Sequence, residues 1–334
     1  MSMTESVAAP VGRVRPLRRA LLFLLKAGLA VALLHWMVRR SILDFGVLSR
    51  LAVDSRTIGL CALGLACVFL AVALLAKRLT LILRHRDLPV PFSRALGLTL
   101  IGALFGSVLP GLVGGDVVKA VYLCTDARGR RVEALAGVMV DRVLGLYSLL
   151  LLGTLALGAA RLAHFEWVSM PILMAAPTAV AALTAGMVMI AWDAPARWGA
   201  VRAVFVRLPG KIQTLIRSLR SYLKSPALML RVVALSLCVH GLTVIAFVIA
   251  ASLLRDGLQV SAHFVLNPLA MAMNMVPLTP GGLGLAEGAF GYLFEQAGSS
   301  NGAIIGLLGR LIQYTVFGIG GAVALMAMKV SLRE

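Results

Sequence analysis

Apolar residues along the chain gather into runs long enough to cross a bilayer. A transmembrane helix needs about 20 consecutive apolar residues. Six uninterrupted stretches have that length, at 18–38, 57–76, 135–160, 169–192, 232–254 and 303–328. No stretch of the chain has the pattern of a strand. The pattern therefore predicts an all-α polytopic integral membrane protein with about six transmembrane helices.

Composition supports this class and excludes several others. The 334 residues are 60% hydrophobic and only 14% charged, with a mean hydropathy of +0.94, whereas a soluble domain is about one quarter charged. These values exclude a soluble enzyme, a secreted disulfide scaffold and a disordered chain. The formal net charge is +18, but no soluble stretch is long enough to carry a nucleic-acid-reading module, so no nucleic acid is expected as a partner.

The chain is expected to form one membrane domain with a short polar arm. Residues 1–16 predict a disordered cytoplasmic arm, and residues 17–330 predict a single transmembrane domain that contains a basic cytoplasmic loop at 193–231. The arm has the basic cluster of a signal peptide, but no small-residue cleavage site closes the apolar run that follows. We therefore expect a retained first helix.

Lysine and arginine are distributed unequally between the two sides of the membrane. The N-terminal arm, segments 77–94, 119–131 and 193–231, and the C-terminal tail hold 24 of these cations, and the opposite segments hold six. Cytoplasmic loops carry the excess of Lys and Arg in membrane proteins. Both termini are therefore expected in the cytoplasm, although the outer segment 39–56 carries four cations and argues weakly against it.

Two further apolar stretches, 95–122 and 263–296, are interrupted near their middles. The first contains the sequence GSVLPGLVGGD at 106–116, and the second contains NMVPLTPGGLGLAE at 274–287. Proline and glycine in such numbers suit a turn and not a continuous helix. Given the orientation above, both ends of the first stretch are cytoplasmic and both ends of the second are external. We therefore predict two re-entrant hairpins that enter from opposite faces.

The two hairpins belong to halves of similar order. Each half contains a span, a Pro/Gly-Gly hairpin, and a final span with an Arg and a nearby Tyr. The halves cover about 57–160 and 232–328, and their first spans run in opposite directions. This order predicts an inverted repeat, the arrangement in which transporters place a binding site at the repeat interface near mid-membrane.

A polar cavity is expected between the hairpins, because non-helical backbone inside a bilayer is tolerated only against protein or water. Helix N-termini at the glycine turns would present free N–H groups and partial positive charge, which favour an anion. The candidate substrate-binding residues are the charged and polar residues near the turns and the turn residues themselves: Arg142, Arg310, Asp116, Lys119, Glu287, Asn274, Tyr314, Gly114, Gly115, Pro280, Gly281 and Gly282.

Each charged candidate also has a structural alternative. An arginine in a span costs at least about 2.5–3.5 kcal/mol if it faces lipid, so Arg310 either binds an anion, reaches the headgroups or pairs with Glu287. Arg142 lies nearer a boundary and suits an interfacial anchor equally well. Asp116 and Glu287 follow glycine pairs, where a carboxylate caps a helix, and Lys119 is spaced to pair with Asp116.

The same motifs resemble a known family. The strings LPGLVGGDVVKA (109–120), DRVLGL (141–146) and the segment 277–287 resemble the flippase-like transmembrane domain of lysylphosphatidylglycerol synthases, over about 17–330. The resemblance implies movement of a lipid, often one with a modified or sugar-bearing headgroup, between leaflets. No segment corresponds to the soluble aminoacyl-transferase domain of the best-known members, so a headgroup-modifying enzyme is expected to be a separate protein.

We hypothesise a lipid flippase in a bacterial-type cytoplasmic (inner) membrane. It would move an anionic phospholipid or a polyprenyl-phosphate-linked lipid, with Arg142 and Arg310 holding the phosphate and Asp116 and Glu287 positioning or releasing these cations. The histidines and cysteines have no metal-ligand spacing, and no nucleotide loop or catalytic triad is found. We therefore expect no enzyme activity, no cofactor and no metal.

Two other functions remain open at this point. The first is a non-transporting scaffold that binds a lipid- or glycan-biosynthetic enzyme through the loop at 193–231. The second is an integral-membrane lipid-modifying enzyme that uses Asp116 and Glu287. The expected partners are membrane lipids with an anionic headgroup or a polyprenyl phosphate, and a separate headgroup-modifying enzyme is a further possible partner.

Overall fold

The computed structural model describes residues 54–108, 114–127, 129–163, 171–192, 206–207, 210–275, 279 and 282–331, together with single positions between 28 and 46. The secondary structure across these ranges is helical, without any strand. The chain is therefore an all-α polytopic membrane protein, which confirms the predicted fold class. The expected arm at 1–16 and almost all of the expected span at 18–38 lie outside the described residues.

Four helices are long and apolar enough to cross a bilayer in the described part of the chain: α2 (Ser55–Arg84), α5 (Arg131–Leu162), α10 (Pro226–Leu253) and α13 (Gly302–Ser331). They match four of the expected spans. The fifth, 169–192, forms a short 3-10 turn η3 (Pro171–Met174) and α6 (Ala175–Ala191). Helix α6 has 17 residues, about 26 Å, which is shorter than the roughly 30 Å hydrocarbon core.

Helix α2 is longer than its apolar run predicts. The run ends at 76, but the helix continues through Lys77 and Arg78 to Arg84. The sequence argument counted these cations with a basic cytoplasmic segment, and the structure shows in addition that the side chain of Arg78 is buried among helices. A buried ion pair, described below, explains how the helix tolerates this charge.

Each interrupted apolar stretch forms a pair of packed helices. The first pair is α3 (Phe92–Val108) and α4 (Gly114–Asp126). The second is α11 (Val260–Ala272), followed by the 3-10 turn η4 (Met273–Met275), and α12 (Leu285–Gln296). In both pairs the break falls on the predicted Pro/Gly segment. Residues 109–113, 276–278 and 280–281 lie outside the described residues, and these include the candidates Pro280 and Gly281.

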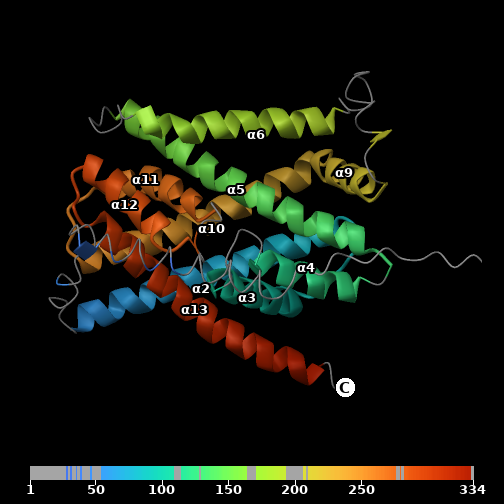
Figure 1. Ribbon diagram of the computed structural model, residues 1–334, viewed down its shortest axis with the longest axis horizontal. Helices are drawn as coiled ribbons and strands as arrows, with labels where there is room; N and C mark the ends of the chain where they lie inside the picture. The colour runs from blue at the N-terminus through green and yellow to red at the C-terminus, as the bar shows by residue number, and fades with distance from the viewer. Residues whose placement is uncertain are drawn as a thin grey trace, which may run out of the picture.

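The two halves of the chain pack reciprocally. Helix α2 packs along α10, α5 packs on α11 of the other half, and α13 packs on α3 of the other half. Contacts within each half match as well, since α4 packs on α5 and α12 packs on α13. Figure 1 shows α11 and α12 at the left end of the molecule, with α3 and α4 on the opposite side of its centre.

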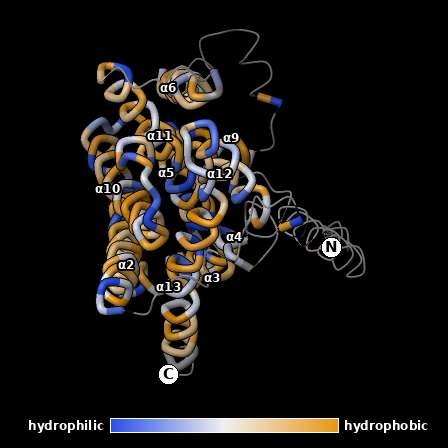
Figure 2. Tube along the Cα trace, turned by 90° about the vertical axis from the view of Figure 1, so that its left-hand side faces the viewer, coloured by the Kyte–Doolittle hydropathy of each residue, from blue (hydrophilic) through white to orange (hydrophobic). Residues whose placement is uncertain are grey.

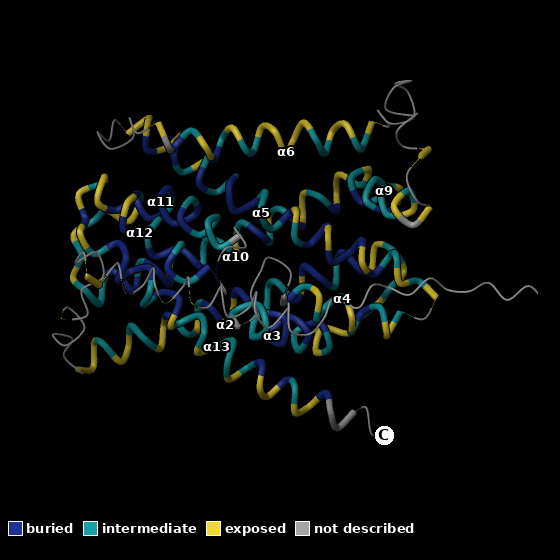
Figure 3. The backbone as a smooth tube through the Cα atoms, in the orientation of Figure 1, coloured by how far each residue is buried: buried dark blue, intermediate teal, exposed yellow. Residues whose placement is uncertain are grey.

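The surface and interior have the character of a protein covered by lipid. Large apolar residues are exposed on the outer faces of α2 and α13, including Ile58, Phe69, Ile319 and Met326, and apolar positions dominate both helices in Figure 2. Figure 3 shows buried residues along the central helices, including α5, α10 and α11, and exposed positions all along α6. In water this much exposed apolar surface would be unfavourable.

The predicted basic loop at 193–231 contains regular structure. Residues 210–223 form the amphipathic helix α9 (Gly210–Leu223), and the last residues of the segment already belong to α10. Tyr222 anchors α9, because its ring is fully buried against residues of α2, α5 and α10 such as Ile82, Val140 and Val232. Burial raises the pKa of Tyr222 to about 12.

Candidate substrate site between the two hairpins

A cavity of about 270 Å³ lies between the two helix pairs. Its lining combines residues of both halves. They come from α2, α3, α4, α5, η4, α13 and the turn before α12: Leu75, Thr99, Gly102, Ala103, Gly106, Ser107, Gly115, Asp116, Lys119, Arg142, Asn274, Thr279, Gly282, Arg310, Gln313, Tyr314 and Phe317. Eight of the predicted site residues are in this set.

The first ion pair joins α4 to α5 at the cavity wall. Asp116 lies in the first turn of α4, where the partial positive charge of the helix N-terminus favours a carboxylate. Arg142 donates from Nη1 to Asp116 Oδ2 at 2.6 Å. Lys119 lies one turn further along α4, and its Nζ is 3.2 Å from Asp116 Oδ1. Two cations therefore share one carboxylate.

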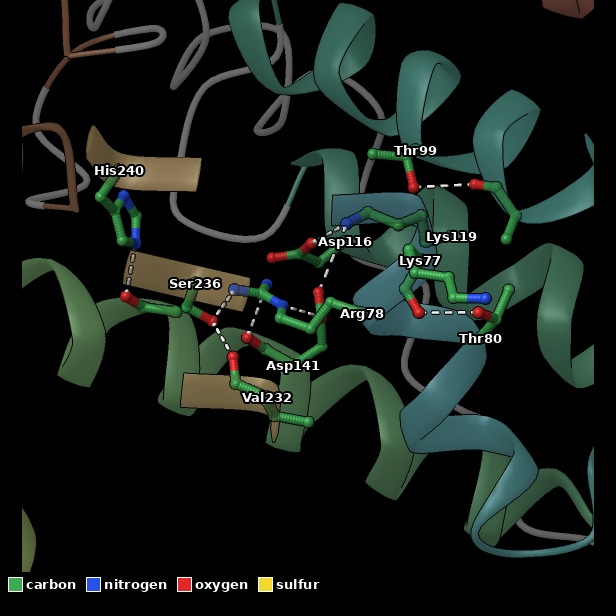
Figure 4. Close-up of polar contacts among 12 residues, drawn as sticks. Lys77, Arg78, Thr80, Thr99, Asp116, Lys119, Asp141, Val232, Ser236 and His240 are labelled. Atoms are coloured by element: carbon green, nitrogen blue, oxygen red, sulfur yellow. Dashed lines mark hydrogen bonds and ion pairs between the residues drawn. The ribbon is translucent and has the colours of Figure 1, made fainter. Parts of the chain in front are cut away.

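A buried network continues from this pair into the helix bundle (Figure 4). Arg78 of α2 donates from Nε to Asp141 Oδ1 at 2.7 Å and from Nη1 to Ser236 Oγ at 2.9 Å. Asp141 Oδ2 lies 4.0 Å from the Nζ of Lys119. Both Arg78 and Asp141 are buried, and a buried charge is stable only when it is paired and hydrogen-bonded. The network therefore joins α2, α5 and α10 to the cavity.

The second ion pair joins α12 to α13. Arg310 donates from Nη1 to Glu287 Oε1 at 2.8 Å and from Nη2 to the hydroxyl of Tyr314 at 2.7 Å. The other oxygen of Glu287 accepts from the backbone N–H of Gly284 at 2.7 Å. Glu287 therefore caps α12 and neutralises Arg310 at the same time, which combines two of the alternatives that the sequence allowed.

The turn before α12 contributes polar groups to the cavity. Gly282 has a φ of +73° and Gly284 a φ of +81°, values that favour glycine. A β-carbon on Gly282 would lie 2.6 Å from Asn274 Oδ1. Within the described part of the chain, Asn274 Oδ1 and the buried hydroxyl of Thr279 have no hydrogen-bond partner. Unpaired buried polar atoms are uncommon, so both atoms are available to a ligand or water.

Most of the predicted site residues that the structure describes line this cavity, and the exceptions are as follows. Glu287 does not line the cavity itself and contacts it through Arg310. Gly114 is the first residue of α4 and does not belong to the lining set. Tyr147, the expected counterpart of Tyr314, lies instead beside Thr184 of α6, with 3.4 Å between their hydroxyl oxygens.

Sequence reasoning missed several residues of this site. Thr99, Ser107 and Gln313 line the cavity, but single polar residues in apolar helices give no signal of which face they occupy. Arg78 gave no local signal either, because it directly follows the apolar run that ends at 76, and only the structure shows that α2 continues past it to Arg84. Among the described residues, no group of three His, Cys, Asp or Glu is placed to hold a metal ion.

The cavity is electrically unbalanced in favour of anions. Its described lining contains the cations Lys119, Arg142 and Arg310 and one carboxylate, Asp116. Glu287 neutralises Arg310 from behind the wall. Hydrogen bonds from Arg and Lys to a phosphate are about twice as strong as neutral ones. The arrangement therefore suits one anionic group of the size of a lipid phosphate.

Comparison with protein families identifies a family that matches most of the chain. Residues 21–321 match the family model described as the lysylphosphatidylglycerol synthase TM region. The match includes both helix pairs and every residue of the cavity. No curated protein matches the chain.

Proposed function

We propose that this chain, which belongs to the family of the lysylphosphatidylglycerol synthase transmembrane region, moves an anionic lipid between the leaflets of a cytoplasmic (inner) membrane. Both termini would lie in the cytoplasm, and the α3–α4 and α11–α12 pairs would enter the membrane from opposite faces. The observation that carries the proposal is the cavity between these pairs, where Lys119, Arg142 and Arg310 face one lining carboxylate.

The barrier to lipid movement is the transfer of the charged headgroup. A phosphate in hydrocarbon loses its hydration, and an unpaired charge there costs many kcal/mol. A cavity of about 270 Å³ is below the usual 300–1,000 Å³ range of small-molecule pockets. It therefore accommodates a headgroup while the acyl chains stay in the bilayer, and its cations replace the lost water.

The ion pairs provide a reason for reversible binding. Asp116 holds Arg142 and Lys119, so that each of these two cations has a carboxylate partner inside the membrane. A phosphodiester carries a single negative charge, as the carboxylate does, and its oxygens accept hydrogen bonds from the same donors, so it competes with Asp116 for these two cations. The carboxylate recovers them when the lipid leaves, which suits transport better than permanent binding.

This role needs no bond to be made or broken, and we propose a transporter and not an enzyme. The carboxylates that a lipid-modifying enzyme would use, Asp116 and Glu287, are both engaged by arginines. A scaffold role would depend on α9 and the surrounding 193–231 segment and not on the cavity.

Reconstitution into liposomes tests the proposal. Fluorescent phosphatidylglycerol, with phosphatidylcholine as the zwitterionic comparison, is quenched from outside by dithionite. We expect the protein to move fluorescent phosphatidylglycerol from the inner to the outer leaflet, where dithionite quenches it. The rate of this movement should be at least about tenfold lower for Arg142→Gln. Arg94→Gln is the matched control, since its pair with Asp126 lies on the surface.

Three outcomes would contradict transport through this cavity. They are equal movement of both lipids, an unchanged rate for Arg142→Gln, and no movement of either lipid. Loss of cellular function on deletion of 193–224, with normal function for Arg142→Gln, would favour the scaffold. Conversion of the lipid in detergent would favour the enzyme.

A further inference from the structure

The two equivalent ion pairs differ in their access to the cavity. Arg142 and Asp116 have side-chain exposures of 38% and 15%, whereas Arg310 and Glu287 have 4% and 0%. Arg310 also donates to the carbonyl of Gly282 at 3.3 Å. The first pair therefore presents its charge to the cavity, and the second pair is enclosed by protein.

The two repeats also differ in charge beside these pairs. Lys119 lies three residues after Asp116, and the corresponding position after Glu287 is Phe290. Phe290 is fully buried and stacks on Phe247, with ring centroids 5.0 Å apart. An aromatic ring thus occupies the second half where the first half has a cation.

The long helices α5 and α13 differ in charge as well. Asp141 precedes Arg142, and Gly309 precedes Arg310. Asp141 holds Arg78, but a β-carbon on Gly309 would overlap the ring of Phe247. The second half therefore has no room for a further charged group or for an anion at the equivalent place.

The charges of the first half leave one cation in excess. Arg78, Lys119 and Arg142 are connected through two carboxylates, Asp116 and Asp141. The Arg310–Glu287 pair adds no net charge. An occupant with a single negative charge completes the balance, whereas a second negative charge would remain uncompensated at low dielectric.

We propose that the cavity contains one anion site, located in the first repeat between Lys119 and Arg142, and that it selects a monoanionic phosphodiester over a phosphomonoester or pyrophosphate. This inference rests on the proposed function and specifies its substrate class. Within the described residues, Arg142 Nε and the hydroxyl of Thr279 are buried without a hydrogen-bond partner. Both residues line the cavity and supply further hydrogen bonds to phosphate oxygens.

Calorimetric titration of the purified full chain tests this site at pH 8. The probes are dioctyl phosphate, a phosphodiester; dodecyl phosphate, a monoester with a second pKa of about 6; and inorganic phosphate. We expect one dioctyl phosphate per chain, bound about tenfold more tightly than the other two probes. Lys119→Met and Arg142→Gln should each weaken binding at least about tenfold, and the surface control Arg94→Gln less than about twofold.

A charge-altering variant tests the selectivity separately. Asp116→Asn keeps the size and shape of the side chain but raises the cationic excess by one charge. We expect this variant to prefer dodecyl phosphate over dioctyl phosphate, the reverse of the wild type. Tighter binding of dodecyl phosphate requires a folded variant, so this outcome cannot be produced by misfolding.

Several results would overturn the inference. Binding of two anions per chain would indicate one site in each repeat. Tighter binding of dodecyl phosphate than of dioctyl phosphate by the wild type would contradict the charge balance. Inorganic phosphate binding as tightly as dioctyl phosphate would assign the site to a free anion. If dioctyl phosphate binds as described but no lipid moves in liposomes, the proposed transport is wrong and the anion site stands. If lipid moves but dioctyl phosphate does not bind in this way, the anion site is wrong and transport stands.

Discussion

Gly102 and Gly115 face each other where α3 and α4 cross, and no side chain separates their backbones. A β-carbon on Gly115 would overlap the carbonyl oxygen of Gly102, and one on Gly102 would lie 2.7 Å from Cε of Lys119. Small residues allow such close helix contacts in membranes. This contact places Asp116 and Lys119, which follow Gly115 on α4, against the cavity.

Gly115→Ala is therefore expected to separate α3 from α4. Overpacking of this kind typically costs about 1–3 kcal/mol, and it should also abolish anionic lipid movement. Gly158→Ala on α5 is the control, because a β-carbon there meets no atom within 4 Å and alanine favours a helix. Thermal unfolding in detergent measures both variants. Equal stability of the two variants would show that the close contact does not exist.

The Arg310–Glu287 pair is expected to behave as a unit. Removing one partner leaves a buried unpaired charge, so Arg310→Met or Glu287→Gln should each destabilise the protein by about 3–5 kcal/mol. The double variant should cost less than the sum of the two single changes. A double-mutant cycle of unfolding free energies measures the difference, and strict additivity would argue against the pair.

Asp141→Asn should also be strongly destabilising, because it leaves Arg78 buried without its carboxylate. The expected loss is again about 3–5 kcal/mol. The surface pair Arg94–Asp126 is the comparison, with side-chain exposures of 23% and 40%, and Asp126→Asn should cost less than about 1 kcal/mol. Chemical denaturation of both variants checks the contrast, which similar losses would contradict.

Tyr222 provides a prediction that depends on pH. Its hydroxyl is buried without a hydrogen-bond partner among the described residues, and its pKa is raised from 10.0 to about 12. The folded protein thus keeps a proton that the unfolded chain loses above pH 10. The contribution of this group to stability is complete below pH 10 and declines between pH 10 and about 12.

Tyr222→Phe tests this directly, since it removes an unpaired polar atom and preserves packing. We expect its stability at pH 8 to equal or exceed that of the wild type by up to about 1 kcal/mol. Its stability should also fall less steeply between pH 10 and 12. Tyr222→Ala should lose about 3–5 kcal/mol. A clear loss for Tyr222→Phe at pH 8 would imply a hydrogen-bond partner for the hydroxyl.

The orientation of the helix pairs can be tested by labelling single cysteines in a background without the native four. Asp87 and Gln259 are exposed residues just before α3 and α11, respectively. If the pairs enter from opposite faces, Asp87→Cys should react with a membrane-impermeant maleimide only from the cytoplasmic side. Gln259→Cys should react only from the outside. Labelling of both from one side would rule out an inverted repeat.

The predicted hairpins and their acids followed from local chemistry. Clusters of proline and glycine favour a turn over a continuous helix, so the breaks before Gly114 and before Leu285 could be placed from sequence. The pairing of Arg310 with Glu287 could be stated as an alternative, because a charge inside a span needs a partner.

Other parts of the site depend on tertiary contacts that no local pattern encodes. Arg78 follows an apolar run at the place where a helix commonly ends, and only its contacts with Asp141 and Ser236 explain why α2 continues. The orientations of Thr99 and Gln313 depend on how α3 and α13 rotate against their neighbours. The unequal exposure of Arg142 and Arg310 is likewise a property of packing.

The reciprocal packing of the two halves would couple their movements. The first helix of each pair, α3 or α11, packs on the last long helix of the opposite half, α13 or α5. A displacement of one pair would therefore also displace the helix that carries the other half's arginine. In the proposed transporter, opening of the cavity toward one leaflet would therefore be coupled to its closing toward the other.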